Sequence, residues 1–261
     1  MKLNKDILNR SSSRGFPHTQ LKFLLLSILR FLSFIGVPKL MVGRLYFWFI
    51  ITNGLLLQFI KRRVNERTVE YLWLLRNLDE NKKKVLDIGC SGSFLSYELI
   101  ARGYDTYGVD IGEYNERPLE MKFYLSDIRS LLFENDFFDQ IILVSTLEHI
   151  GIGTFGDPQY ENGDLIALKE IKRLLTPTGK VFITVPYAEK SSITWHRFYD
   201  NQRLQKFTEN GLVIIKEEYF RRIKNRWTKY TKEDFSKGKF TLEKNKVSCI
   251  VCLILAQKEN K

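Results

Sequence analysis

The stretch VLDIGCSGSFLSYEL, residues 85–99, restricts the fold of this chain more than any other feature. An apolar run ends at a glycine, and a helical pattern begins a few small residues later. A buried strand followed at once by a helix is the repeating unit of parallel α/β sheets. Gly89 would let a ligand approach the backbone, and the free N–H groups of the next helix can hold polar ligand atoms. The stretch therefore predicts a ligand site between a strand and a helix.

The rest of the chain continues this alternation. Strands are expected at KVLDIG, YDTYGVDI, MKFYLSD, FFDQIILVS, KVFITVP, LVIIKEEYF and KVSCIVCLILAQK, and helices at SFLSYELIARG, GDLIALKEIKRLL and DNQRLQKFTENG. The order predicts an α/β fold with a Rossmann-like, doubly wound and mostly parallel seven-stranded sheet that has helices on both faces. Ligands of such sheets bind beyond the carboxyl ends of the strands.

Basic charge is concentrated in the first quarter of the chain. Residues 1–63 carry eleven Lys and Arg side chains and one acid, a net +10, whereas residues 64–261 carry 30 basic and 29 acidic side chains, a net +1. Because positive and negative side chains nearly cancel in residues 64–261, the charge of this part does not suggest that it binds nucleic acid. The expected organisation is a mobile polar head over residues 1–20, a basic apolar helical extension over residues 21–63, and one globular domain over residues 64–261.

The extension has the pattern of a helix at a membrane surface. On a helical wheel one arc is polar and the rest is Leu, Phe and Ile; the arc holds Lys22, Ser27, Arg30 and Ser33. The uncharged run at residues 45–60 would cover about 24 Å as a helix, less than a bilayer core of about 30 Å. Whether it spans, dips into or avoids the membrane is left open, as is the alternative that it covers the domain's core or a dimer interface.

Basic residues directly after the uncharged run give that part of the chain an expected orientation. Lys61, Arg62 and Arg63 lie between the run and the globular body. The positive-inside tendency therefore puts the body in the cytoplasm, at the inner face of the membrane, with an anionic membrane surface as the partner of residues 21–63.

Four motifs, in order over about residues 70–256, resemble those of the class I S-adenosylmethionine-dependent methyltransferases. Asp87 precedes Gly89 in the first motif, Asp110 ends the second strand in GVDI, Asp127 follows the third strand in LSDI, and STLEHIG ends the fourth. EIKRLLTPTGKVFITVP is similar to the family's helix, turn and fifth strand. The resemblance implies methyl transfer with S-adenosyl-L-methionine as cofactor. EHIGIGTFGDPQYENGDLIALKEIKRLL and HRFYD also resemble a branch of which some members are associated with surface-glycan metabolism.

The resemblance also implies a set of cofactor-binding residues. They are Asp87, Gly89, Cys90, Ser91, Gly92, Asp110, Ile111, Asp127, Ile128 and Ser145. Asp110 would accept from two ribose hydroxyls, Asp127 would contact the adenine amino group, and Asp87 would hold the amino end of the methionine moiety. Either of the first two could instead be a turn acid. Ile111 and Ile128 would flank the adenine or belong to the core.

Two serines depart from the family's pattern. Ser91 and Ser93 stand where glycines are usual. Serine is small enough to admit the cofactor, but it does not adopt positive φ as freely as glycine. The two serines therefore bear on how tightly the cofactor binds more than on the assignment to this family.

A hydroxyl or amine acceptor must lose a proton, which histidine can take up near neutral pH. His149 follows the fourth strand, where the acceptor is expected, and is the candidate general base; His196 follows the fifth. Glu148 would orient a neighbour or bind substrate, and Tyr199, with Trp195, would line the acceptor pocket. Each of these side chains could instead order a loop or pack in the core.

Two other kinds of site are disfavoured. Cys249 and Cys252 lie three apart in a strand pattern, where they point to opposite faces, and no second cysteine pair exists to complete a zinc site, so no metal is expected. A nicotinamide oxidoreductase is disfavoured because the glycines do not follow G-x-G-x-x-G and no Tyr-x-x-x-Lys occurs. A non-catalytic, membrane-recruited binding module stays an alternative. The acceptor, whether small molecule, glycan or lipid-linked, is not revealed.

Overall fold

The computed structural model describes residues 65–81, 84–209, 211–224, 226–232 and 247–258. The expected polar head and the basic apolar extension, residues 1–63, lie outside the described residues. None of the helices in the described part of the chain has the length and hydropathy that crossing a membrane requires.

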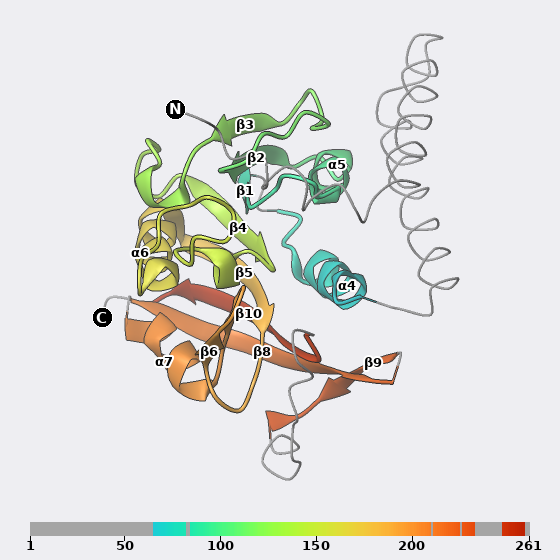
Figure 1. Cartoon of the computed structure of the whole chain (residues 1–261). Helices are drawn as coiled ribbons and strands as arrows, with labels where there is room; N and C mark the ends of the chain where they lie inside the picture. The colour runs from blue at the N-terminus through green and yellow to red at the C-terminus, as the bar shows by residue number, and fades with distance from the viewer. Residues whose placement is uncertain (1–64, 82–83, 210, 225, 233–246, 259–261) are drawn as a thin grey trace, which may run out of the picture. The chain divides into compact units, whose positions relative to one another are not determined.

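The main sheet has eight strands in the order β3-β2-β1-β4-β5-β10-β8-β9 (Figure 1). The first five in sequence that belong to this sheet pair in parallel: β1 Lys84–Ile88, β2 Asp105–Asp110, β3 Lys122–Leu125, β4 Phe138–Val144 and β5 Leu175–Pro186. The remaining strands pair antiparallel: β8 Leu212–Ile223, β9 Arg226–Tyr230 and β10 Cys249–Gln257. The Rossmann-like, mostly parallel sheet is confirmed, but seven strands is wrong, because β9 adds an eighth at the edge.

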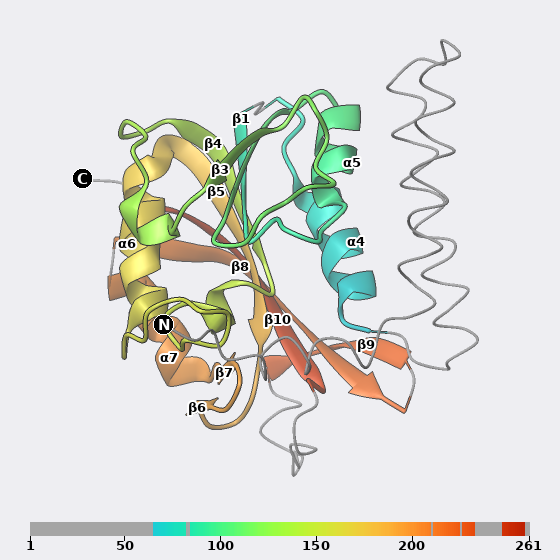
Figure 2. The same cartoon turned by 45° about the horizontal axis from the view of Figure 1, so that its top comes forward.

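Helices cover both faces of this sheet (Figure 2). On one face lie α4, Arg67–Asn77, and α5, Leu95–Ala101; on the other lie α6, Gly163–Leu174, and α7, Asn201–Glu209. Each face has its own hydrophobic core, since Trp73 and Leu99 pack in one cluster and Ile171 and Phe207 in the other. The sheet between the two cores is therefore buried on both sides, which explains the continuous apolar runs of its central strands.

The antiparallel strand β10 connects the two cores. Cys249 faces the α6–α7 core, and Cys252 faces the α4–α5 core. Both are buried free thiols, as expected for residues three apart in a strand. The C-x-x-C pair is thus part of the packing.

Short elements after the strands complete the carboxyl edge of the sheet. They are the 3₁₀ turns η1, Ile128–Ser130, and η2, Leu147–His149, and a small hairpin of β6, Ser192–Ile193, with β7, Arg197–Phe198. Each turn begins directly after a parallel strand, so the side chains that follow β3 and β4 converge at one edge.

Candidate active site

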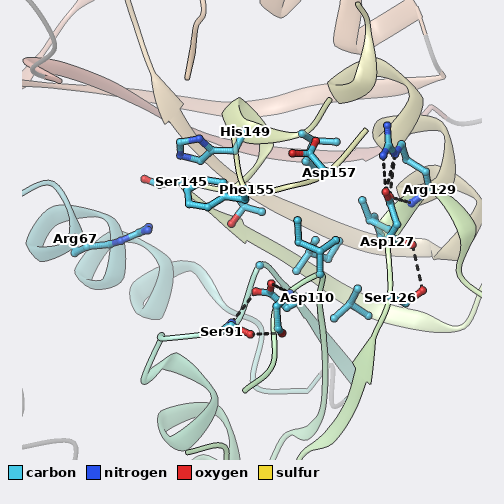
Figure 3. A pocket seen from close by; sticks show the side chains of 18 residues that line it. Arg67, Ser91, Asp110, Ser126, Asp127, Arg129, Ser145, His149, Phe155 and Asp157 are labelled. Carbon is cyan, nitrogen blue, oxygen red and sulfur yellow. Dashed lines mark hydrogen bonds and ion pairs between the residues drawn. The ribbon is translucent and has the colours of Figure 1, made fainter. Parts of the chain in front are cut away.

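A cavity of about 430 Å³ lies at the carboxyl ends of the parallel strands (Figure 3). Its walls come from the turns after β1, β2, β3 and β4, from the loop after η2, and from the start of α4. Eight of the residues expected from the sequence line it: Gly89, Ser91, Asp110, Ile111, Asp127, Ile128, Ser145 and His149. Other lining residues were not expected, among them Arg67, Arg129, Thr146, Phe155 and Asp157.

The β1–α5 turn requires glycine at its first position. Gly89 has φ +76°, and a Cβ built there would lie 2.4 Å from the side chain of Thr146. The conformation and the close approach each exclude a larger residue. The turn therefore brings its backbone to the cavity surface without a side chain in the way.

The two serines that replace glycines do not strain the turn. Among the described residues, the non-glycine residues with positive φ are Asp136, Ser145 and Lys224, so Ser91 and Ser93 have ordinary backbone conformations. The Ser93 hydroxyl accepts the N–H of Leu95 at 3.1 Å, in the first turn of α5. Ser93 thus satisfies one of the free N–H groups at this helix end.

Asp110 joins two turns at the cavity edge. Its Oδ2 accepts the backbone N–H of Ser91 at 2.8 Å, and its Oδ1 accepts that of Gly112 at 2.8 Å. The Ser91 hydroxyl in turn donates to the Gly112 carbonyl at 2.9 Å. Because a carboxylate accepts about four hydrogen bonds, these two leave capacity for hydroxyl groups of a ligand.

Asp127 is paired within its own turn. It accepts the backbone N–H of Arg129 at 2.9 Å and forms an ion pair with the Arg129 guanidinium (Figure 3). This hydrogen bonding lowers the pKa of Asp127 and keeps it ionised. The guanidinium lies over the ring of Tyr160, 4.3 Å from its centroid. An arginine in the cavity wall therefore accompanies the acid that was expected from the sequence.

Arg67, in the cavity wall, pairs with one buried carboxyl group and lies near two others. Arg67 donates to Glu70 at 3.3 Å and to the Val144 carbonyl at 2.7 Å, and Glu70 also accepts from the hydroxyl of Ser145 at 2.6 Å. The charge of Arg67 also acts on Asp87 and Glu148.

Two of these carboxyl groups are incompletely paired. In the part of the chain that the structure describes, Oδ2 of Asp87 and Oε2 of Glu148 have no hydrogen-bond partner. Burial, and then the charge of Asp110, raise the pKa of Asp87 to about 8. Burial also raises the pKa of Glu148 to about 8. A cation at this end of the cavity would offset the cost of ionising them.

His149 is the candidate base that reaches the cavity. Burial, and then the neighbouring His196, lower its pKa to about 4, so the imidazole is neutral at physiological pH. Its ring centroid lies 4.9 Å from that of Phe155 and 5.5 Å from that of Trp195. His196 is buried behind it, with ring centroids 6.0 Å apart, and does not line the cavity.

Several other expected site residues lie away from the cavity wall. Tyr199 is buried in the core, where its hydroxyl donates to Asp164 at 3.1 Å, so the expectation that it lines the acceptor pocket does not hold for this cavity. Asp164 holds the Tyr199 side chain in the core, and the Tyr199 backbone N–H donates to the carbonyl of Pro186, the last residue of β5, at 2.9 Å. Cys90 packs against Met121 and Tyr114. The lining also omits Asp87, Gly92 and Glu148.

The loop after η2 carries Phe155 and is fixed at both ends. A Cβ at Gly151 would lie 2.7 Å from the Cα of Gly163, and one at Gly163 would lie 2.6 Å from the Cα of Gly151. The Tyr160 N–H also donates to the Gly151 carbonyl at 2.7 Å. Phe155 is a large apolar residue between two glycines in the stretch GTFG, and this pattern in the sequence indicates an exposed aromatic side chain on a loop.

Comparison with known proteins identifies the family. A family model described as a methyltransferase domain matches residues 59–219. The ubiquinone biosynthesis O-methyltransferase of Coxiella burnetii is 31% identical over 111 residues, which cover 39% of this chain and 43% of the relative. The chain thus spans less than half the length of the curated relatives it matches.

Solved methyltransferase structures share the fold. One is the 1,6-didemethyltoxoflavin-N1-methyltransferase of Burkholderia thailandensis, with 1,6-didemethyltoxoflavin and S-adenosylhomocysteine bound. It has a TM-score of 0.51 and 14% identity over 74% of this chain and 76% of that one. Another is a SAM-dependent methyltransferase of Methanosarcina mazei, with a TM-score of 0.51 and 14% identity over 76% of this chain and 100% of that one.

The cavity fits the cofactor of this family. The backbone turn at Gly89 admits a ligand, and Asp110 has acceptor capacity for hydroxyl groups. Asp87, outside the lining, has an oxygen without a hydrogen-bond partner among the described residues. The family model covers more than half of the chain. The chain therefore belongs to the family of methyltransferase domains.

Proposed function

We propose that the cavity binds S-adenosylmethionine along the carboxyl ends of β1 and β2 and transfers its methyl group to a small molecule beside His149. The observation that carries the proposal is Asp110, which ends β2 at the cavity edge and is oriented by the N–H groups of Ser91 and Gly112. A carboxylate held in this way accepts from two vicinal hydroxyls with little loss of side-chain entropy.

The other cofactor contacts follow from where each residue lies when the cofactor is placed along β1 and β2 in this way. Asp87 lies below the β1 turn and outside the cavity lining, and its Oδ2 has no partner among the described residues. It would take the ammonium group of the methionine moiety on this oxygen, directly or through water. Ile111 and Ile128 line the cavity and would bound the adenine. Asp127 already accepts four hydrogen bonds from the backbone N–H and guanidinium of Arg129, so it would accept from the adenine amino group only by giving up part of this pairing. Of the remaining expected contacts, Ser145 lines the wall, and Cys90 and Gly92 shape the turn.

The chemistry required of the protein is positioning and proton removal. When bound, the cofactor supplies an electrophilic methyl group on a sulfonium. His149, neutral at physiological pH, accepts the proton of the acceptor group. Glu148 and His196, buried behind the wall, position the η2 turn rather than touch the substrate.

The relatives support a small-molecule acceptor without specifying it, since the Coxiella proteins are named for O-methylation in ubiquinone biosynthesis. A glycan or lipid-linked acceptor would need the cavity to open toward a larger molecule. Incubation with radiolabelled methyl donor, followed by an untargeted search for labelled products, identifies the acceptor. Cofactor binding without turnover on any product would instead support a non-catalytic binding module.

Calorimetric titration with S-adenosylhomocysteine tests the cofactor site before any acceptor is known. Binding with one-to-one stoichiometry is expected. Folded protein that binds neither S-adenosylhomocysteine nor S-adenosylmethionine would remove the basis of the proposal.

We also propose that residues 21–63 bind an anionic membrane surface, which would keep the domain at the inner face. The support is the charge of +10 in residues 1–63 together with the apolar run at residues 45–60. Each basic residue near an anionic leaflet contributes about 1 kcal/mol. Replacing Lys61, Arg62 and Arg63 together by alanine should therefore weaken binding to anionic vesicles by roughly a hundredfold.

Co-flotation of the full chain with vesicles measures this effect. Vesicles of neutral lipid are the control, and weaker binding to them is expected. If the full chain stays in the soluble fraction with both kinds of vesicle, residues 21–63 have another role, such as covering the core or forming a dimer.

A further inference from the structure

Aromatic rings from three separate segments gather around His149, which lines the cavity together with Phe155, whereas Trp195 lies outside the lining and contacts the His149 ring. His149 belongs to η2, Phe155 to the following loop, and Trp195 to the β6–β7 hairpin. Phe155 lies edge-on to His149 at an interplanar angle of 84°, and Trp195 is tilted by 38° to it. Figure 3 shows Phe155 next to His149 on the cavity side. The candidate base, His149, therefore lies beside the rings of Phe155 and Trp195.

These rings remain exposed although they are large and apolar. Phe155 is 62% exposed and Trp195 is 48% exposed. Both rings contact His149, so the three side chains form one continuous group. Contiguous exposed apolar patches mark surfaces used for binding. An aromatic or other planar ring is a suitable ligand, because aromatic pairs stack or meet edge to face at centroid separations of about 4.5–7 Å.

The backbone holds both exposed rings in place. The Thr154 hydroxyl donates to the Trp195 carbonyl at 3.0 Å and so ties the loop to the hairpin. At the base of the loop, Oδ2 of Asp157 accepts the Gly151 N–H at 2.8 Å. Because the loop and hairpin are fixed to each other, the rings form a preformed surface that needs little ordering when a ligand binds.

The strength of the candidate base also limits the acceptor. Burial lowers the pKa of His149 to about 4, which makes its imidazole a weak base. Proton removal by a weak base is efficient only when the acceptor is comparatively acidic. A phenolic hydroxyl has a pKa of about 10, as in tyrosine, and aliphatic alcohols such as sugar hydroxyls are far less acidic. Base strength therefore favours the same kind of acceptor as the rings.

We propose that the methyl acceptor is a phenol, whose ring packs against Phe155 and Trp195 and whose hydroxyl faces His149. This inference rests on the proposed function. The phenolic proton passes to the His149 imidazole and then to solvent. An electron pair of the phenolic oxygen forms the new O–CH₃ bond, and the S–CH₃ bond breaks with its electrons left on sulfur. The products are an aryl methyl ether and S-adenosylhomocysteine.

The test uses the full chain saturated with S-adenosylhomocysteine, and catechol as the probe. Calorimetry should show catechol binding more tightly than its saturated analogue, cyclohexane-1,2-diol. Phe155→Leu and Trp195→Leu should each weaken catechol binding by about threefold to tenfold, the loss expected for one aromatic contact. The matched control is Ile193→Ala, at a residue of the same hairpin that is also exposed. It should leave the dissociation constants of catechol and S-adenosylhomocysteine unchanged.

A second measurement follows labelled methyl groups from S-adenosylmethionine to catechol and to a simple hexose. Label on catechol and not on the hexose is expected. The phenol proposal is overturned if catechol and its saturated analogue bind alike, if both leucine variants bind catechol as the parent does, or if the hexose is labelled instead. Each of these results leaves the proposed function intact as long as S-adenosylhomocysteine binds. Failure of S-adenosylhomocysteine to bind overturns the proposed function and the phenol acceptor with it.

Discussion

Asp110 combines two tasks in one side chain, since it orients the turns at Ser91 and Gly112 and presents its remaining lone pairs to the cavity. We expect Asp110→Asn to weaken S-adenosylhomocysteine binding by about 1.5–3 kcal/mol, the range for a hydrogen bond to a charged group. Calorimetry measures the change. Asp105→Asn, at the other end of β2, is the control, because that carboxylate pairs with Lys122 on the surface. Equal affinity of Asp110→Asn and the parent would exclude the ribose role.

His149 is expected to act in the chemical step alone. His149→Gln should lower turnover by roughly 10²–10⁴, while the affinity for S-adenosylhomocysteine stays within about twofold of the parent because no cofactor contact is assigned to this ring. Steady-state kinetics with the identified acceptor, beside calorimetry, separates the two effects. His196→Gln is the comparison and should lose less, since His196 does not line the cavity. Full activity of His149→Gln would give His149 a structural role.

At the scale of single site residues, the sequence predicts those that directly follow a strand. Gly89 and His149 follow from this rule, because an apolar run locates the strand and the next residues must reach its carboxyl edge. Asp110 and Asp127 are implied by the family resemblance. Arg67 escaped prediction because its bond to the Val144 carbonyl joins residues 77 positions apart.

The sequence places Tyr199 in the acceptor pocket because it does not show a second long-range contact. Its hydroxyl bonds to Asp164, 35 positions away, and this partner holds it in the core. No local pattern records such a contact, so sequence alone cannot tell a buried aromatic side chain from one that lines a pocket.

The β1–α5 turn offers a test at the level of a secondary-structure element. Gly89 and Gly92 have similar positive φ values, +76° and +74°, but only Gly89 has a side chain, that of Thr146, in the space a Cβ would take. Gly92→Ala should therefore cost only the conformational penalty, about 1–2 kcal/mol. Gly89→Ala should cost more and also abolish cofactor binding. Urea unfolding measures both, and equal losses for the two variants would contradict the contact with Thr146.

Among the elements, the central strands are predictable and the edges are not. Strands β1, β2, β4, β5 and β10 are buried on both faces, so long apolar runs reveal them. Edge strand β9 has no fully buried residue, and its sequence RWTKY reads as a polar loop. The two-residue strands β6 and β7 are too short for any periodicity. Alternation of side chains identifies a strand only when one or both of its faces are covered.

For the whole molecule, the buried carboxyl groups make stability depend on pH. Asp87 and Glu148 have ordinary pKa values of 3.8 and 4.5, which burial raises to about 8. Between pH 6.5 and 8 the folded chain therefore binds more protons than the unfolded chain, and the free energy of unfolding should fall as pH rises. The lowered pKa of His149 has the opposite effect, but only below its ordinary value of 6.5.

Denaturant unfolding of the ligand-free protein at several pH values between 6.5 and 8 measures how the free energy of unfolding changes with pH. Each carboxyl group contributes at most about 1.4 kcal/mol per pH unit. Asp87→Asn should remove its share of the slope, and Asp105→Asn, on the surface, should not. An unfolding free energy that rises from pH 6.5 to 8 would show that these carboxyls are ionised in the folded protein.

The backbone contact between Gly151 and Gly163 has a consequence for how such an enzyme can diversify. The contact brings the two ends of residues 152–162 together, and Asp157 inside the segment adds a hydrogen bond to the Gly151 N–H. The tip of this segment can therefore be exchanged as a cassette, with changes of length absorbed there and the sheet left undisturbed. A library that keeps both glycines, Asp157 and Tyr160 and randomises the tip around Phe155 would sample new acceptor preferences while the turns at Asp110 and Asp127 stay unchanged.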